Sequence, residues 1–231
     1  MSYSLSIIIP AYNDEVTISE VIKEALDTAK SVSNKFQVLI LDDGSKDETG
    51  ETIKKLAHTH KNLKVIHHVK NFGFGQTLKT LFLNKDCEVN LLIPGDGQIR
   101  PREIFKMWPY LKKYDLILGR RRIRKDNLKR KIGSYVYNTL VSIICKRRIN
   151  DVNSVVLYKT RIFNNINLES KSALIHAELL IKANKKGYKL CEIPIEHFPR
   201  TSGRGGGGKL TTIVSTAVEL IKKWKKLSNY R

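Results

Sequence analysis

The feature that most constrains the fold is a regular alternation of short apolar runs with segments of helical periodicity. The runs predict strands at residues 6–9, 36–41, 63–69, 89–93 and 115–119. The intervening segments predict helices at 16–31, at 47–59, from 76 onward, and once more before 115. This alternation is typical of an α/β fold, with a mainly parallel twisted sheet and helices on both faces.

Polar residues follow four of the predicted strands. In an open α/β sheet, ligands bind beyond the carboxyl ends of the strands. Repetition at four strand ends therefore predicts one ligand site along that edge. The residues concerned are Tyr12 and Asn13, Asp42 and Asp43, Asp96 and Gln98, and Arg120 and Arg121.

The second half of the chain is more basic. Residues 120–131 contain eight basic residues and one acidic residue, and 132–144 show apolar positions at helical spacing. The glycines at 205–208 predict a hinge before a basic, amphipathic helix within 209–231. We therefore divide the chain into a main domain at 1–203 and a hinge with a tail helix at 204–231. An amphipathic helix of either kind can pack in a core, in a dimer or on a membrane surface.

Charge and cysteine usage narrow the function classes. The 231-residue chain has 42 Lys and Arg against 22 Asp and Glu, a net charge of +20, which indicates an anionic partner such as phosphorylated substrates, an anionic membrane or nucleic acid. No nucleic-acid-binding motif is recognisable, so nucleic acid is not the expected partner. Three scattered cysteines, no signal peptide and no apolar stretch of about 20 residues predict a cytoplasmic protein, peripheral on the cytoplasmic face of the membrane.

Several sequence blocks resemble those of family-2 glycosyltransferases with the Rossmann-like GT-A fold, in the dolichyl- and polyprenyl-phosphate mannose or glucose synthase branch. The opening blocks are similar to 7–13 and 41–49, and the metal-binding block to Asp96-Gly97-Gln98 with Pro101 and Glu103. Residues 151–154 resemble the D-x-x-S part of its D-x-x-S-G-F block. The later blocks resemble 178–180, 187–188, 192–194 and Arg200.

The resemblance implies a nucleotide-sugar site. Aspartates at a strand end can accept hydrogen bonds from ribose hydroxyls or base N–H groups, although Asp43-Gly44-Ser45 alone would read as a simple turn. The residues implied to bind the nucleotide sugar are Pro10, Tyr12, Asp14, Asp42, Asp43 and Asp96.

The metal block departs from the family pattern. The resemblance implies Mg²⁺ or Mn²⁺ at Asp96 and Gln98. Asp96 is counted as catalytic because the ion that it would hold neutralises the charge growing on the leaving diphosphate. Pro94 stands where the family has the first acid of its D-x-D block. The expected result is weaker metal binding, or a share of the neutralisation taken by Arg and Lys residues.

The sequence supports two hypotheses about the chemical nature of the acceptor. The resemblance implies phosphate binding by Arg121, Arg130 and Arg200, which suits a lipid phosphate because it is already anionic at neutral pH. A hydroxyl acceptor would instead need a general base, and Asp151 and Glu178 are the candidates. Val155-Val156 replace the family's G-F, which bears on the acceptor channel.

The leading hypothesis is an enzyme that transfers a hexose from a UDP- or GDP-sugar to a polyprenyl phosphate with inversion, in cell-envelope glycan biosynthesis. One alternative is transfer to a glycan hydroxyl; another is a catalytically weak lipid- or nucleic-acid-binding protein on the same scaffold. A homo-oligomer is possible, and the sequence does not determine the oligomeric state. The histidines at 58, 60, 67 and 68 are predicted to be solvated and outside any metal site, with His58 and His60 in a helix-to-strand loop.

Overall fold

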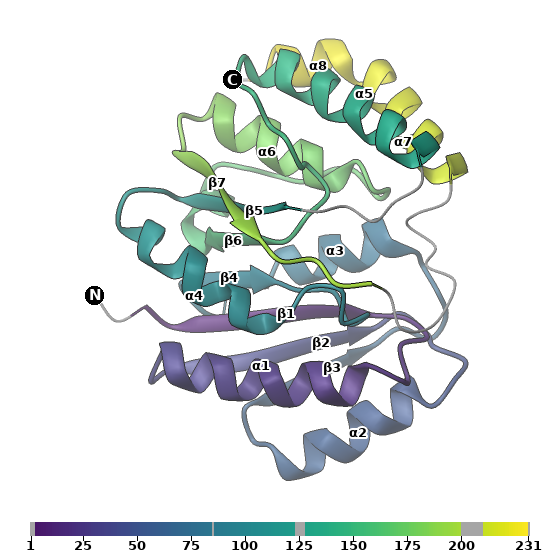
Figure 1. Cartoon of the computed structure of the whole chain (residues 1–231), viewed down its shortest axis with the longest axis vertical. Coiled ribbons are helices and arrows are strands. Elements are labelled where there is room, and N and C mark those ends of the chain that lie inside the picture. Colours follow the sequence, from purple (N-terminus) through teal and green to yellow (C-terminus); the bar gives the residue numbers. More distant parts are fainter. Residues whose placement is uncertain (1–2, 85, 123–127, 200–209, 231) are drawn as a thin grey trace.

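The computed structural model describes residues 3–84, 86–122, 128–199 and 210–230, with the backbone alone at 128–130 and 210–213. These residues form a seven-stranded sheet in the order β3-β2-β1-β4-β6-β5-β7, covered by helices (Figure 1). The predicted α/β class is confirmed.

The strands are short, and those in the middle of the sheet are buried on both faces, as expected of a sheet covered on two sides. Their bounds are β1 Leu5–Ala11, β2 Phe36–Asp42, β3 Leu63–His67, β4 Val89–Leu92, β5 Leu116–Arg121, β6 Val156–Lys159 and β7 Leu190–Ile195.

The sheet is mainly parallel, with one inserted antiparallel strand. β1 pairs in parallel with β2 and β4, β2 with β3, and β5 with β7. β6 runs antiparallel to both β4 and β5. It therefore joins the two parallel parts of the sheet and begins at the edge where the other strands end.

Two hydrophobic clusters, one on each face, hold the helices to the sheet. Alternate residues of β1 separate between them: Ile7 and Ile9 belong to the cluster under α1, whereas Ile8 belongs to the cluster under α3, α5 and α6. The helices are α1 Ile18–Val32, α2 Thr49–Thr59, α3 Phe74–Phe82, α4 Ile104–Met107, α5 Leu128–Cys145, α6 Ile175–Lys185, α7 Leu210–Lys222 and α8 Trp224–Ser228, with 3-10 turns at Pro101–Glu103, Trp108–Lys112 and Thr160–Asn164.

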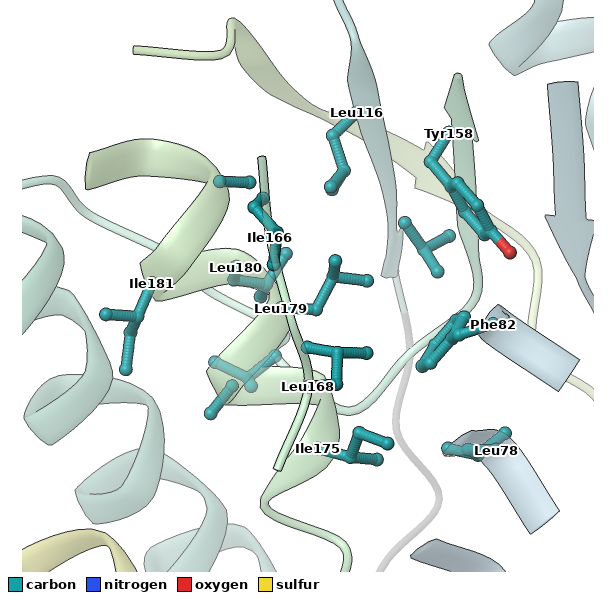
Figure 2. Packing of buried hydrophobic residues seen from close by; sticks show 14 of the residues in the cluster. Leu78, Phe82, Leu116, Tyr158, Ile166, Leu168, Ile175, Leu179, Leu180 and Ile181 are labelled. Carbon is teal, nitrogen blue, oxygen red and sulfur yellow. The ribbon is translucent and has the colours of Figure 1, made fainter. Parts of the chain in front are cut away.

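The α6 face contains large side chains from distant parts of the sequence. Figure 2 shows Leu179 and Leu180 of α6 pointing toward Leu116 of β5, with Phe82 of α3 beside Tyr158 of β6. The Phe82 and Tyr158 rings meet edge to face at a centroid distance of 5.7 Å. This packing fixes the position of α3 relative to β6 and the position of α6 relative to β5.

The C-terminal helices pack on the main body. α7 and α8 lie along α5 at one end of the molecule (Figure 1). Leu220 and Leu227 are buried in the same cluster as α5 and α6, and Lys185 Nζ donates to the Ser228 carbonyl at 2.8 Å. The predicted hinge at 204–208 lies outside the described residues, and the division at 203 stays a prediction. No described helix is both long enough and apolar enough to cross a bilayer.

Candidate active site

The parallel strands bring the predicted polar residues to one edge of the sheet. Ala11 at the end of β1 pairs with Asp42, and Asp42 pairs with His67 at the end of β3. The Gly95 amide, after β4, donates to the Pro10 carbonyl at 3.1 Å. The ends of β1, β2, β3 and β4 are therefore neighbours. The sequence pattern predicted this for β1, β2 and β4, and the end of β3 with His67 is an addition.

Asp42 is buried and holds the turn that follows β2. Its Oδ1 accepts the Ser45 amide at 3.1 Å and the Ser45 hydroxyl at 2.5 Å, and its Oδ2 lies 3.2 Å from His67 Nδ1. The Ser45 hydroxyl in turn accepts the Asn13 amide at 3.0 Å. Asp42 thus connects the ends of three strands.

Asp43 fastens the loop between β3 and α3. Its carboxylate accepts the amides of Phe72 at 3.0 Å and Gly73 at 2.9 Å, and contacts His68 Nδ1 at 2.7 Å. Gly44 is needed beside it, because its φ is +68° and an added Cβ would come within 2.5 Å of the Lys70 backbone. This arrangement closes a polar corner around the strand ends.

The segment after β1 forms the other wall of this corner. Asp14 is buried and its Oδ2 accepts the Tyr12 amide at 3.1 Å, while the Asp14 amide donates to the Thr49 hydroxyl at 2.8 Å. The Thr17 hydroxyl donates to the Gly95 carbonyl at 2.8 Å. Tyr12 stays 39% exposed, which gives the corner an aromatic surface.

The Asp96 block is tied to the segment that follows β7. Asp96 Oδ1 accepts the Gln98 amide at 3.1 Å, and Gln98 and Phe198 are joined through their backbones at 2.8 Å. Among the described residues, no cluster of three or more His, Cys, Asp or Glu side chains gathers in a metal-binding arrangement. One carboxylate and one amide still suit Mg²⁺, which commonly takes one or two carboxylates together with waters and substrate phosphates.

Arg121 and Asp151 form a buried bidentate pair at the end of β5. Arg121 Nε lies 2.7 Å from Asp151 Oδ2, and Nη2 lies 2.6 Å from Oδ1. The Arg121 amide adds a third contact to Oδ2 at 3.2 Å. Two parallel charge-assisted bonds fix the plane of the guanidinium. The structure thus joins the predicted phosphate-binding arginine to one of the two predicted bases.

Glu178 is committed to contacts around the start of α6. It accepts the amides of Glu169 at 3.0 Å and Ser170 at 2.7 Å, and its Oε1 lies 2.7 Å from Lys182 Nζ. Burial raises the pKa of Glu178, but the bonds from Lys182 and the two amides outweigh it and hold the pKa below the usual range. This bonding does not favour a general-base role, which stays a prediction for Glu178 and for Asp151.

Two histidine features are absent from the sequence prediction. His68 is not a solvated residue, because its side chain is only 14% exposed and is paired with Asp43, and His67 is paired with Asp42. His176 of α6 is buried against the rings of Phe74 and Phe82. The sequence did contain a signal for His67 and His68, because they stand at the end of the strand that comes after the acidic Asp42-Asp43 turn. Nothing in the local sequence indicates that His176 is buried.

Two predicted phosphate ligands cannot be placed. The side chain of Arg130 and all of Arg200 lie outside the described residues.

The chain belongs to the family whose model is described as Glycosyl transferase family 2, which matches residues 6–171. It is 25% identical to an undecaprenyl-phosphate 4-deoxy-4-formamido-L-arabinose transferase of Proteus mirabilis, over 86% of this chain and 61% of that protein. It is 26% identical to a dolichyl-phosphate beta-glucosyltransferase of Trichomonas vaginalis, over 96% of this chain and 73% of that protein. The chain thus spans about three fifths of the length of the Proteus relative.

Solved structures share the fold. Glucosyl-3-phosphoglycerate synthase of Mycobacterium tuberculosis, in complex with Mn²⁺, uridine diphosphate and phosphoglyceric acid, superposes with a TM-score of 0.74 at 14% identity, over 99% of this chain and 80% of that one. Another crystal of that enzyme contains Mg²⁺ and uridine diphosphate. The predicted GT-A fold is confirmed, and divalent metals occur in proteins of this fold.

Proposed function

We propose that the protein transfers a hexose from a nucleoside-diphosphate sugar to a polyprenyl phosphate, with inversion at the anomeric carbon. A phosphate oxygen of the lipid attacks the anomeric carbon, the bond from that carbon to the β-phosphate oxygen breaks, and the nucleoside diphosphate leaves. Two relatives whose names specify lipid-phosphate acceptors support this choice.

The observation that carries the proposal is the Arg121–Asp151 pair at the edge of the sheet that also bears the Asp42, Asp43 and Asp96 carboxylates. A sugar hydroxyl would need a carboxylate able to take its proton. Asp151 instead accepts three bonds from Arg121, and Glu178 is paired with Lys182. A phosphate acceptor needs a fixed cation and no base, which this arrangement supplies.

The donor would bind in the corner between β1, β2 and β4. Tyr12 offers an apolar surface for a base, and the Asp42–Asp43 turn offers acceptors near the ribose. Asp96 and Gln98 would hold Mg²⁺ or Mn²⁺, which supplies positive charge for the diphosphate. With Pro94 in place of one acid, diphosphate oxygens and waters would complete the coordination of the ion.

We place the acceptor lipid, and hence an anionic membrane surface, against the outer face of α5 and α7. The two helices are neighbours, and both expose apolar residues at helical spacing on the side away from the core. The exposed apolar residues are Ile132, Tyr135, Val136 and Ile143 of α5, and Val214, Val218 and Ile221 of α7. Exposed lysines at 131, 146, 222 and 225 flank them, which complements anionic lipid. A second copy of the chain on this face is the competing outcome.

The test of the function uses the whole chain with UDP- and GDP-hexoses labelled in the sugar, Mg²⁺ or Mn²⁺, and an isoprenyl monophosphate in detergent. Label should enter the organic phase as an acid-labile phosphodiester. Arg121→Gln should reduce this transfer at least tenfold, because one charged hydrogen-bonding partner of the phosphate is lost, a loss of about 1.5–3 kcal/mol. Label that appears only in water-soluble glycan would contradict the proposed acceptor.

The metal requirement is tested in the same assay. Chelation should abolish transfer, and Asp96→Asn should raise the Mg²⁺ concentration needed for half-maximal rate. The matched control is Asp86→Asn, which makes the same change in a half-exposed carboxylate paired with Lys64 away from the site. Equal metal dependence in the wild type and both variants would argue against Asp96 as the ligand.

A further inference from the structure

The loop that carries Asp151 is held by three side chains from two other elements. Ile149 donates its amide to the Ser142 hydroxyl of α5 at 2.9 Å. Glu192 of β7 accepts the Asn150 amide at 2.9 Å and the Asp151 amide at 3.2 Å through the same oxygen. The backbone amides of residues 149–151, which lead up to the Arg121–Asp151 pair, are thus bonded to side chains and not to a neighbouring strand.

The second side of the loop is held by one asparagine of α5. Asn138 Nδ2 donates to the Asn150 carbonyl at 2.6 Å, and its Oδ1 accepts the Val152 amide at 3.2 Å. Glu192 also accepts the Asn150 side-chain amide at 2.6 Å. Asn138 and Glu192 therefore clamp the two residues on either side of Asp151.

We infer that Glu192 and Asn138 are positioning residues, which orient Arg121 toward an anionic acceptor group by fixing Asp151. The inference rests on the proposed function for the nature of the acceptor. The bonds of both side chains go to the loop that carries Asp151: Glu192 accepts from Asn150 and Asp151, and Asn138 bonds Asn150 and Val152.

The energetics favour a positioning role. A guanidinium held by two parallel bonds keeps one direction, whereas a displaced carboxylate would let it rotate among several rotamers. Loops without ladder bonds keep a fixed geometry only where other groups satisfy their amides. Misplacement of a binding group by about 1 Å is enough to lower a rate by about two orders of magnitude.

The first experiment compares the Michaelis constants of Glu192→Ala, Glu192→Gln and the wild type for isoprenyl monophosphate and for the sugar nucleotide. Glu192→Ala should raise the acceptor KM about tenfold, the equivalent of one buried hydrogen-bond defect, and leave the donor KM within twofold. Glu192→Gln should be intermediate, since one oxygen can still accept the two amides. The control is Glu196→Gln, an exposed glutamate one residue beyond β7. Parallel rises in both Michaelis constants would overturn the inference.

A double-variant cycle separates positioning from general loss of structure. If Glu192 acts through Arg121, then Glu192→Ala should change the acceptor KM less than twofold in an Arg121→Gln background. Additive effects in that background would show that Glu192 acts by another route. Asn138→Ala should give the same pattern, because it removes the opposite arm of the clamp.

A spectroscopic measurement tests the clamp without any acceptor. The Arg121 Nε–H should give a protected NMR signal in the wild type, because Asp151 accepts it at 2.7 Å. The signal should exchange faster in Glu192→Ala and be unchanged in Glu196→Gln. If the wild type transfers no sugar to isoprenyl phosphate, the proposed function fails, and this signal still decides the clamp: no change in Glu192→Ala would refute it.

Discussion

Carboxylates at the sheet edge differ in what they hold. Asp43 holds a loop through two amides and a histidine, whereas Asp151 holds an arginine. In both cases the neighbouring residues that complete the arrangement are separated from the aspartate by 25 or more positions. The chemistry of each carboxylate is therefore defined by its partners.

Replacing Asp43 by alanine should weaken nucleotide binding and destabilise the fold together. The amides of Phe72 and Gly73 would lose their acceptor, which should lower the free energy of unfolding by about 2–3 kcal/mol. The affinity for UDP or GDP should fall about tenfold or more by titration calorimetry, since the loop forms one wall of the donor corner. Asp86→Ala, at a half-exposed surface site, is the control. Equal nucleotide affinity in Asp43→Ala and Asp86→Ala would contradict this role.

His176 should make the protein less stable in mild acid. Burial, with the Arg121 charge adding to it, lowers the pKa of His176 to about 4 against 6.5 for an exposed histidine. The folded state therefore binds fewer protons than the unfolded state once the pH falls below about 6.5, and stability is lost from there toward pH 4. Between pH 7 and pH 5 the loss from this residue should be about 2 kcal/mol.

The measurement is urea unfolding of the wild type and His176→Phe at pH 7 and pH 5. Phenylalanine keeps an aromatic ring between Phe74 and Phe82 and cannot titrate. The variant should lose less stability on acidification by about that amount, because the other histidines are shared by both proteins. An identical pH dependence in the two proteins would contradict the lowered pKa of His176.

At the scale of elements, helix α7 contributes to the core and to the surface through different sides. Leu220 is fully buried and Ile221 is 59% exposed. Leu220 of α7 and Leu227 of α8 pack in the core, whereas Val214, Val218 and Ile221 of α7 are exposed. α7 and α8 behave in the structure as a cover for α5 and α6.

Two adjacent substitutions in α7 should therefore differ sharply. Leu220→Ala should cost about 2–5 kcal/mol of unfolding free energy, because it leaves a cavity under the helix. Ile221→Ala should stay within about 0.5 kcal/mol, as expected of an exposed position. Denaturant unfolding of the full chain measures both. Similar small effects would mean that α7 is a separable tail, as the sequence division at residue 204 supposes.

At the scale of the whole molecule, the net charge of +20 and the outer face of α5 and α7 should act together on membranes. The protein should sediment with anionic vesicles and not with neutral ones, and binding should weaken as salt rises toward about 0.5 M, since exposed charges are screened. Ile143→Glu should reduce vesicle binding at low salt with no change in melting temperature, because Ile143 is exposed.

The matched control for the surface is Ile143→Leu, which keeps the position apolar. Vesicle binding that is equal in Ile143→Glu and Ile143→Leu would remove α5 from the docking surface. Dimerisation of the wild type that is lost in Ile143→Glu would instead assign this face to a second copy of the chain. Saturable RNA binding at physiological salt would favour the alternative of a nucleic-acid-binding protein.

Much of the fold was open to prediction from local pattern. The strands ending near Asp42 and Gly119 and the helices α1, α2 and α5 lie close to where apolar spacing predicted them. The short β6 and the strand β7 were not predicted, because β6 has only four residues and follows a loop whose bonds come from Asn138 and Glu192. A local window contains no trace of such partners.

The sequence by itself determined the α/β class, the family and the edge of the sheet on which Asp42, Asp43, Asp96 and Arg121 gather. These follow from periodicity, from strand ends and from short motifs, all of which are local. Only the tertiary structure decided that Asp151 is bonded to Arg121 and that Glu178 is bonded to Lys182. The reason is physical: the availability of a carboxylate depends on which groups the folded chain brings within hydrogen-bond distance, and those groups come from other elements.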